Sequence, residues 1–155
     1  MTAARSFIVC SAALLVALAG CGSSARAVSK AEYQAELQKL GRDLTTAGQQ
    51  LGRSIDVATF TRSVDSLQKH LRAAAKELDG LEPPKDVRAA NKRLAKAFRA
   101  LADAFEPVKD ARLKNIVEAR NALARVGAAS AVKDGRLAIH LLQERGYDVA
   151  GLVTP

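Results

Sequence analysis

The chain has 155 residues, and its 24 Lys and Arg against 16 Asp and Glu give a formal net charge of +8. This length accommodates one small domain and a targeting segment, while 48% hydrophobic and 26% charged residues exclude a disordered polyelectrolyte and a protein of many membrane spans. The chain contains 31 alanines, and only 4% of its residues are aromatic. This composition favours helix over sheet.

The first 20 residues have the pattern of an export signal. Met1 to Arg5 forms a short positively charged start, and Phe7 to Ala19 is free of charge. A run of about 13 apolar residues is shorter than the roughly 20 that a transmembrane helix needs, but it fits the apolar core of a signal peptide. We therefore expect residues 1–20 to be removed from the mature chain.

The end of this segment resembles the lipobox of bacterial lipoproteins. In Leu18, Ala19, Gly20 and Cys21, small residues precede a cysteine. The resemblance implies cleavage between Gly20 and Cys21 and a diacylglycerol on the Cys21 sulfur, often with a third acyl chain on the new amine. Two or three acyl chains hold a protein on a membrane essentially permanently, whereas one chain binds marginally. The alternative interpretation is an ordinary secretory signal in which Cys21 is incidental.

The mature chain then begins with a short tether and a first helix. Residues 21–28 are mostly small and are expected to join the lipid anchor to the helix. Ser29 is followed three residues later by Glu32, the spacing of a capping box, so a helix is predicted to begin there. Its apolar face follows alternating steps of four and three residues, through Tyr33, Leu37, Leu40, Leu44, Ala47 and Leu51.

A second helix has the most regular apolar pattern in the chain, and Asp56 is its predicted N-cap. Its apolar face comprises Val57, Phe60, Val64, Leu67, Leu71, Ala74, Leu78 and Leu81. Gly80 suits the C-terminus of this helix because glycine adopts a positive φ without a Cβ penalty. Pro83 and Pro84 cannot continue a helix but can open a new one.

A third helix is predicted from about Pro84 to Phe105. Its apolar face comprises Val87, Asn91, Leu94, Phe98, Leu101, Phe105 and Val108. Asn91 occupies a position where an apolar residue is expected, and we interpret it as a residue that fixes the packing register. Pro107 either kinks this helix or ends it.

The remainder keeps a helical period, but the pattern leaves open whether residues 108–145 form one helix or two. Gly146 is predicted to end the last helix, and residues 147–155 are interpreted as a C-terminal tail. Apolar stripes joined by short connections predict an all-α fold, an antiparallel three- to four-helix bundle over residues 29–146. Each stripe can be buried away from water only by packing against the stripes of the other helices.

Residues 78–97 combine Leu-x-x-Leu-x-Pro-Pro with a basic amphipathic helix. This loose motif resembles a stretch in uncharacterised small helical lipoproteins of Gram-positive, actinobacterial type. The resemblance implies a helical fold and supplies neither an activity nor site residues.

The third helix carries the most distinctive charged feature, which we call the basic ridge: Lys85, Arg88, Lys92, Arg93, Lys96 and Arg99. Asp86 is the only acid among these six cations, so the ridge contributes +5 of the +7 that remain once Arg5 is removed with the signal. Such a ridge would attract anionic lipid headgroups or an anionic polymer of the envelope. The alternative is a solvated helix face, for which Lys and Arg are good helix formers.

No catalytic or metal-binding pattern is evident. His70 and His140 stand in no spacing that places two ligands on one helix face, so no metal is expected. The sequence contains no nucleophile turn and no phosphate loop. Glu32 and Glu36 lie on one outer face of the predicted helix, where charge repulsion or stabilisation by the helix dipole accounts for them better than acid–base catalysis does. We expect no enzyme, and no cofactor apart from the covalent lipid on Cys21. Nucleic acid is not an expected partner, because the protein is exported and no aromatic residues alternate with the cations.

The sequence thus predicts a lipid-anchored protein on the extracytoplasmic face of the cell membrane, or in the periplasm if the organism has two membranes. Its expected role is that of a non-catalytic helical binding or scaffold module, with an envelope protein as partner. Two alternatives stay open: a binder of anionic headgroups or envelope polyanions through the basic ridge, and a carrier of a small ligand within the bundle.

Overall fold

The computed structural model describes residues 25–110, 113–127 and 129–152. These residues are mostly helical, which confirms the all-α class. The helices are α1 (Lys30–Gly52), α2 (Val57–Asp79), α3 (Arg88–Ala104), α4 (Glu106–Asp110), α5 (Ile116–Gly127) and α6 (Ser130–Glu144). Two short strands, β1 (Arg26–Ala27) and β2 (Leu81–Glu82), and two 3-10 turns, η1 (Lys85–Val87) and η2 (Ala150–Leu152), complete the described elements. The predicted signal segment, Gly20 and Cys21 lie outside the described residues.

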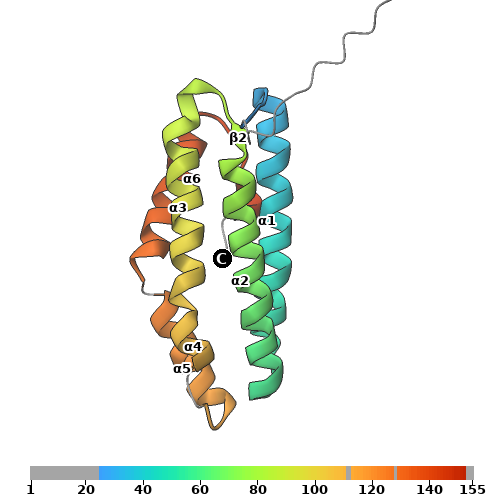
Figure 1. Ribbon diagram of the computed structural model, residues 1–155, viewed down its shortest axis with the longest axis vertical. Coiled ribbons are helices and arrows are strands. Elements are labelled where there is room, and N and C mark those ends of the chain that lie inside the picture. Colours follow the sequence, from blue (N-terminus) through green and yellow to red (C-terminus); the bar gives the residue numbers. More distant parts are fainter. Residues whose placement is uncertain (1–24, 111–112, 128, 153–155) are drawn as a thin grey trace, which may run out of the picture.

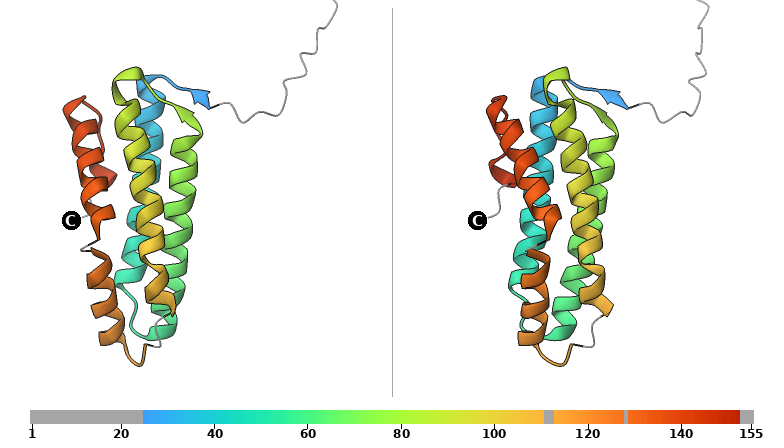
Figure 2. Two further views of the ribbon diagram at one scale, coloured as in Figure 1. Left: turned by 60° about the vertical axis from the view of Figure 1, so that its left-hand side comes forward. Right: turned by 90° about the vertical axis from the view of Figure 1, so that its left-hand side faces the viewer.

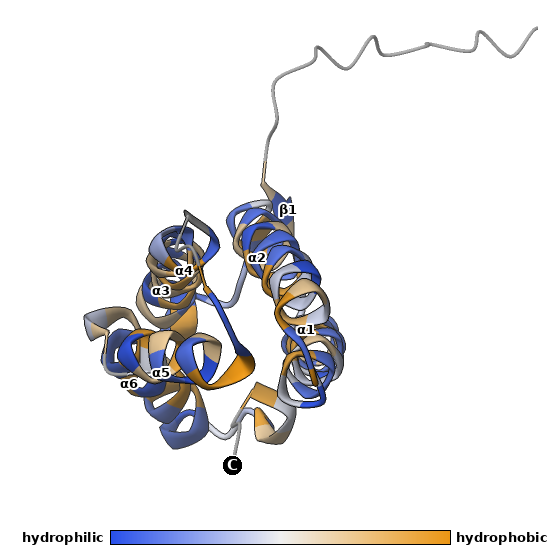
Figure 3. Ribbon diagram, turned by 90° about the horizontal axis from the view of Figure 1, so that it is seen from below, coloured by the Kyte–Doolittle hydropathy of each residue, from blue (hydrophilic) through white to orange (hydrophobic). Residues whose placement is uncertain are grey.

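The long helices lie side by side along the long axis of the molecule (Figure 1). Helix α2 packs against α1 and α3, and α3 packs against α6, while α5 and α6 follow one another along the molecule (Figure 2). Viewed along this axis, the helices surround a common interior (Figure 3). The largest fully buried side chains in this interior include Tyr33, Leu37, Phe60, Val64, Leu78, Leu94 and Leu142.

The first two helices begin where their capping residues predict. The Ser29 hydroxyl accepts a hydrogen bond from the Glu32 backbone N–H at 3.3 Å, and the Glu32 carboxylate accepts one from the Ser29 N–H at 2.8 Å. Asp56 accepts a hydrogen bond from the Thr59 N–H at 2.7 Å. Each cap supplies a partner for N–H groups that the first helical turn leaves without one. The predicted N-caps of α1 and α2 are confirmed.

The two predicted glycine ends differ in conformation. Gly80 is the C-cap of α2, but its φ is −76°, so the positive φ expected there is wrong. Its N–H instead bonds to carbonyl groups in the last turn of α2. Gly146 follows α6 with a φ of +72°, as expected of a glycine that ends a helix in the left-handed conformation.

The third helix begins later than predicted. The residues after Pro84 form η1, and α3 starts only at Arg88. Pro107 does not kink α3, which ends at Ala104; it lies in the first turn of the separate helix α4, where its missing N–H costs no helical hydrogen bond. Residues 108–145 are likewise not one helix, because α5 ends at Gly127 before α6 begins.

The predicted tether is in part a strand. Residues Arg26 and Ala27 form β1, which pairs in parallel with Leu81 and Glu82 of β2. The Arg26 N–H donates to the Gly80 carbonyl at 2.8 Å. Two residues are too few to show an alternating pattern, so the sequence carried no signal for this pairing.

The predicted tail is packed against the helices, at least as far as Leu152, and we call residues 147–152 the C-terminal strap. Tyr147, Val149 and Leu152 are buried, and η2 lies against α1. The Thr45 hydroxyl donates to the Gly151 carbonyl at 3.2 Å. The strap thereby fills the space between α1 and the α6 side of the molecule.

The strap approaches α1 at a pair of glycines. A Cβ placed on Gly41 would lie only 2.5 Å from the Gly151 carbonyl carbon and 2.7 Å from its oxygen. Such distances are shorter than any tolerable contact with backbone, which cannot rotate away as a side chain can. Gly41 therefore permits the close contact between α1 and the strap.

Replacing Gly41 tests this contact. We expect Gly41→Ala to lower the free energy of unfolding by about 1–3 kcal/mol, because the added methyl group displaces the strap. Gly48→Ala in the same helix is the matched control: a Cβ there meets nothing within 4 Å, so the gain in helix propensity should stabilise the protein by up to about 1 kcal/mol. Urea denaturation followed by circular dichroism measures both, and an equal stabilisation by the two variants would show that the strap does not restrict Gly41.

Candidate functional site

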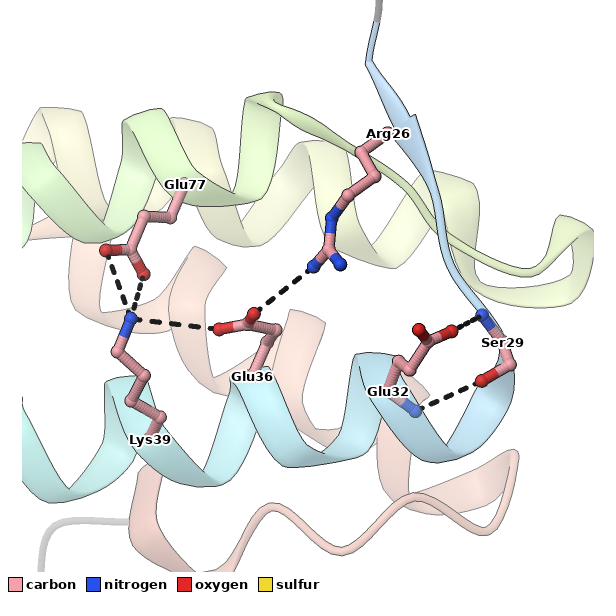
Figure 4. Close-up of polar contacts among 6 residues, drawn as sticks. All are labelled: Arg26, Ser29, Glu32, Glu36, Lys39 and Glu77. Carbon is pink, nitrogen blue, oxygen red and sulfur yellow. Dashed lines mark hydrogen bonds and ion pairs between the residues drawn. The ribbon is translucent and has the colours of Figure 1, made fainter.

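One end of the molecule gathers the segments nearest the predicted anchor. Strand β1, the start of α1, β2, η1 and the start of α3 all lie at this end, at the top of Figure 2. Glu36 of α1 pairs with Arg26 of β1 at 3.3 Å, and Lys39 pairs with Glu36 at 3.8 Å and with Glu77 of α2 at 3.4 Å (Figure 4). Each exposed pair contributes little stability by itself. Together with the β1 and β2 pairing, they fix the position at which the chain enters the helical domain.

A buried polar network lies beneath this end. The Tyr33 hydroxyl of α1 donates to Asn91 Oδ1 of α3 at 3.0 Å, and Asn91 Nδ2 donates to the Leu78 carbonyl of α2 at 2.9 Å. Asn91 is only 3% exposed. Burial raises the pKa of the Tyr33 hydroxyl above its ordinary value, and the nearby Tyr147 adds to this shift, so the hydroxyl stays protonated as a donor. Asn91 is thus a packing residue that links three helices.

The basic ridge is exposed along its whole length, but its members do not share one face. Arg88, Lys92, Lys96 and Arg99 follow at steps of four, four and three residues, which places them on one side of α3. Arg93 lies off this line and turns toward α6, where its Nε is 3.8 Å from a carboxylate oxygen of Asp134. The structure therefore groups four of the six predicted residues on one side of α3, with Lys85 preceding them in η1. Arg93 turns toward α6 and lines a surface depression that it shares with Lys96.

The three arginines of the ridge are paired with acids from other elements. Arg88 pairs with Glu82 of β2, Arg99 with Asp79 at the end of α2, and Arg93 with Asp134 of α6. Asp86 is the only acid within residues 85–99, whereas Asp79, Glu82 and Asp134 lie outside this stretch and reach the ridge through the fold. Half of the predicted positive charge is thus balanced locally.

The three lysines of the ridge keep their charge uncompensated. In the part of the chain that the structure describes, Lys85, Lys92 and Lys96 form no ion pair. All three are exposed, and we call them the lysine row. The row, rather than the six-residue ridge, is the cationic feature that remains available to an outside partner.

A surface depression connects the lysine row to the entry of the chain. It has a volume of about 280 Å³, and its lining includes Ala25 and Lys92 together with Arg88, Asp79 and Glu82. Ala25 is the first described residue, only four positions after Cys21. The chain therefore enters the domain beside Lys92, a proximity that no sequence pattern indicated.

A second depression lies between α4 and α5, toward the opposite end of the molecule. It measures about 350 Å³ and is lined mainly by small and apolar side chains, and Arg125 is the only charged residue among the lining residues that the structure describes. The lining comprises Ala104, Pro107, Val108, Ala122, Arg125, Val126 and Ala129. An apolar surface with one cation at its edge suits an amphipathic anion better than a strongly polar ligand.

The histidines take part in local contacts. His70 Nδ1 lies 2.9 Å from the Ser66 carbonyl one helical turn earlier, and His140 Nε2 lies 3.4 Å from Glu144. Within the described ranges, no group of three His, Cys, Asp or Glu side chains is arranged to hold a metal ion. No helix within those ranges is both long and apolar enough to cross a membrane.

Comparison of the chain with family models, with curated proteins and with solved structures finds no match. Its function is therefore argued from its own residues.

The polar network predicts a specific cost for losing Asn91. We expect Asn91→Ala to lower the free energy of unfolding by about 2–4 kcal/mol, because the Tyr33 hydroxyl and the Leu78 carbonyl are left buried without partners. Asn121→Ala, at an exposed position of α5, is the control and should change stability by less than about 0.5 kcal/mol. Equal, small effects in a denaturation experiment would show that the network does not hold the three helices.

Proposed function

We propose that this protein is an extracytoplasmic lipoprotein whose helical domain is held at a membrane by lipid on Cys21. The observation that carries the proposal is the lipobox-like run from Leu18 to Cys21, placed directly after an apolar segment of signal-peptide length. The distance to the domain supports it, because β1 begins at Arg26, five residues after Cys21. A folded domain that starts so soon after the cysteine suits a short tether to a membrane surface.

We further propose that the domain is an antiparallel three- to four-helix bundle that acts as a non-catalytic binding or scaffold module. Short connections between α1, α2 and α3 and the packing of each against its neighbour support this arrangement. The buried polar side chains support a structural role, since Asn91 and Gln68 donate their amide N–H groups to backbone carbonyls of α2 and α3. The outer surfaces of the helices are then the parts that a partner in the envelope contacts.

Mass spectrometry of the mature N-terminus tests the anchor. In membrane fractions of a bacterial host, we expect an N-terminal peptide that starts at Cys21 and carries the mass of a diacylglycerol. Cys21→Ser should abolish the modified peptide and release the protein from the membrane, because two or three acyl chains supply the attachment. Cys10→Ser is the matched control and should leave the lipid in place, since Cys10 lies within the predicted signal. An unmodified peptide that starts elsewhere would contradict the proposal.

A small-ligand carrier is a second candidate, favoured by the depression between α4 and α5. For this function, a medium-chain fatty acid such as decanoate should raise the melting temperature of the protein by binding the folded state. Arg125→Gln should reduce the rise, because it removes the cation at the edge, whereas Arg120→Gln on the same helix should not. A melting temperature that decanoate leaves unchanged would reject this candidate.

A further inference from the structure

We infer that the lysine row is a membrane-docking surface, which holds the helical domain against anionic phospholipid headgroups of the membrane that carries its anchor. This inference rests on the proposed lipid anchor, and it specifies which face of the domain meets the membrane. Its grounds are the uncompensated charge of the row, the position at which the chain enters the domain, and the length of the tether.

The charge of the row is the first ground. Lys85, Lys92 and Lys96 are exposed and have no ion-pair partner in the described part of the chain. Lys92 and Lys96 are one helical turn apart on α3, and Lys85 precedes them in η1. Three ammonium groups spread along this segment match the dispersed negative charge of a phospholipid surface better than they match a single small anion.

The position of the tether is the second ground. Ala25 and Lys92 line the same depression, and β1 pairs with β2 just before the row begins. Ala25 is four positions after Cys21, and at most about 3.6 Å per residue gives a tether no longer than roughly 14 Å. A cysteine held at the membrane therefore keeps Lys92, which lines the same depression as Ala25, close to the headgroups.

The length of the row fits this geometry. Lys85 and Lys96 are eleven positions apart, three through η1 and eight along α3, which corresponds to about 17 Å. A tilt of the domain that brings α3 toward the membrane therefore brings the whole row close to the membrane surface. Electrostatic attraction acts over about 8–10 Å at physiological salt, so such an approach brings each lysine within range.

The arginines of the ridge are paired within the domain, so their charge is distinct from that of the lysines. Arg88 and Arg99 flank the lysines on the same side, but their partners Glu82 and Asp79 already balance them. Asp86 is exposed beside Lys85 and is the one acid within the row's own segment. The net attraction therefore comes chiefly from Lys92, which lies beside the tether, and from Lys96, with a smaller contribution from Lys85.

A vesicle-binding experiment on the mature chain without lipid tests the inference. Residues 22–155 contain every contact described above, so this form should retain the fold, which circular dichroism checks. We expect it to sediment with vesicles of phosphatidylcholine and phosphatidylglycerol, and not with phosphatidylcholine alone. Binding should weaken steeply as salt is raised, because screening shortens the reach of the charges.

Matched triple variants identify the surface. Lys85→Gln, Lys92→Gln and Lys96→Gln together should lower the vesicle affinity by about 100-fold, at roughly fivefold per lysine near an anionic surface. The control combines Lys69→Gln, Lys114→Gln and Lys133→Gln, three exposed lysines on α2, before α5 and on α6. It removes the same net charge and should keep most of the binding.

Several outcomes would overturn the inference. They are unchanged binding by the row variant, an equal loss in the control variant, equal binding to neutral vesicles, and binding to a soluble acidic polymer without binding to vesicles. The experiment does not depend on Cys21, so its failure and that of the anchor are distinguishable. Lipid on Cys21 without salt-sensitive vesicle binding would leave the lipoprotein proposal intact and reject the docking surface.

Discussion

The buried amide of Asn91 is the constraint on which the arrangement of the first three helices depends. Many of the core residues are alanines, and small methyl groups pack at close range without selecting one helix register over another. A buried amide is more selective, because each of its polar atoms needs a partner at hydrogen-bond distance. Asn91 finds both partners on different helices, Tyr33 on α1 and the Leu78 carbonyl on α2. A shift of any one helix would leave a buried polar group unpaired.

The rest of the fold follows from holding these three helices in place. With Leu78 fixed, the end of α2 presents β2 to β1, and the entry of the chain is set beside the start of α3. The opposite side is less complete, because the helices after α3 are shorter. Helix α6 lies against α3, whereas α5 contacts α2 and α4. The C-terminal strap compensates by bringing Tyr147 against Tyr33, with ring centroids 5.6 Å apart, and Gly151 against Gly41. Both contacts need α1 to hold the register that Asn91 imposes.

The sequence predicts the parts of the structure that depend on local patterns. Ser29 with Glu32, and Asp56 as a cap, are signals within a single helical turn, and the apolar stripes extend over several turns. The strap carries no such signal, because Tyr147, Val149 and Leu152 are buried by contacts with α1 more than a hundred residues earlier. The ridge shows the same limit: its six residues form a basic cluster in the sequence, but Asp79 and Asp134 reach it only through the packing of α2 and α6 against α3.

The division between arginine and lysine on α3 connects this packing to the surface. A guanidinium group is planar and offers paired donors, so it suits a fixed carboxylate on a neighbouring element. An ammonium group is a compact, strongly hydrated charge on a flexible chain, which suits a surface whose anions are mobile. Arg88, Arg93 and Arg99 accordingly join α3 to its neighbours, while Lys85, Lys92 and Lys96 face outward. Exchanging the two residue types along α3 would keep the net charge, but it would weaken the internal pairs and turn the better carboxylate binders toward solvent. The basic segment from η1 through α3 therefore divides by residue type into arginines that pair with other elements of the domain and lysines that form no ion pair in the described part of the chain.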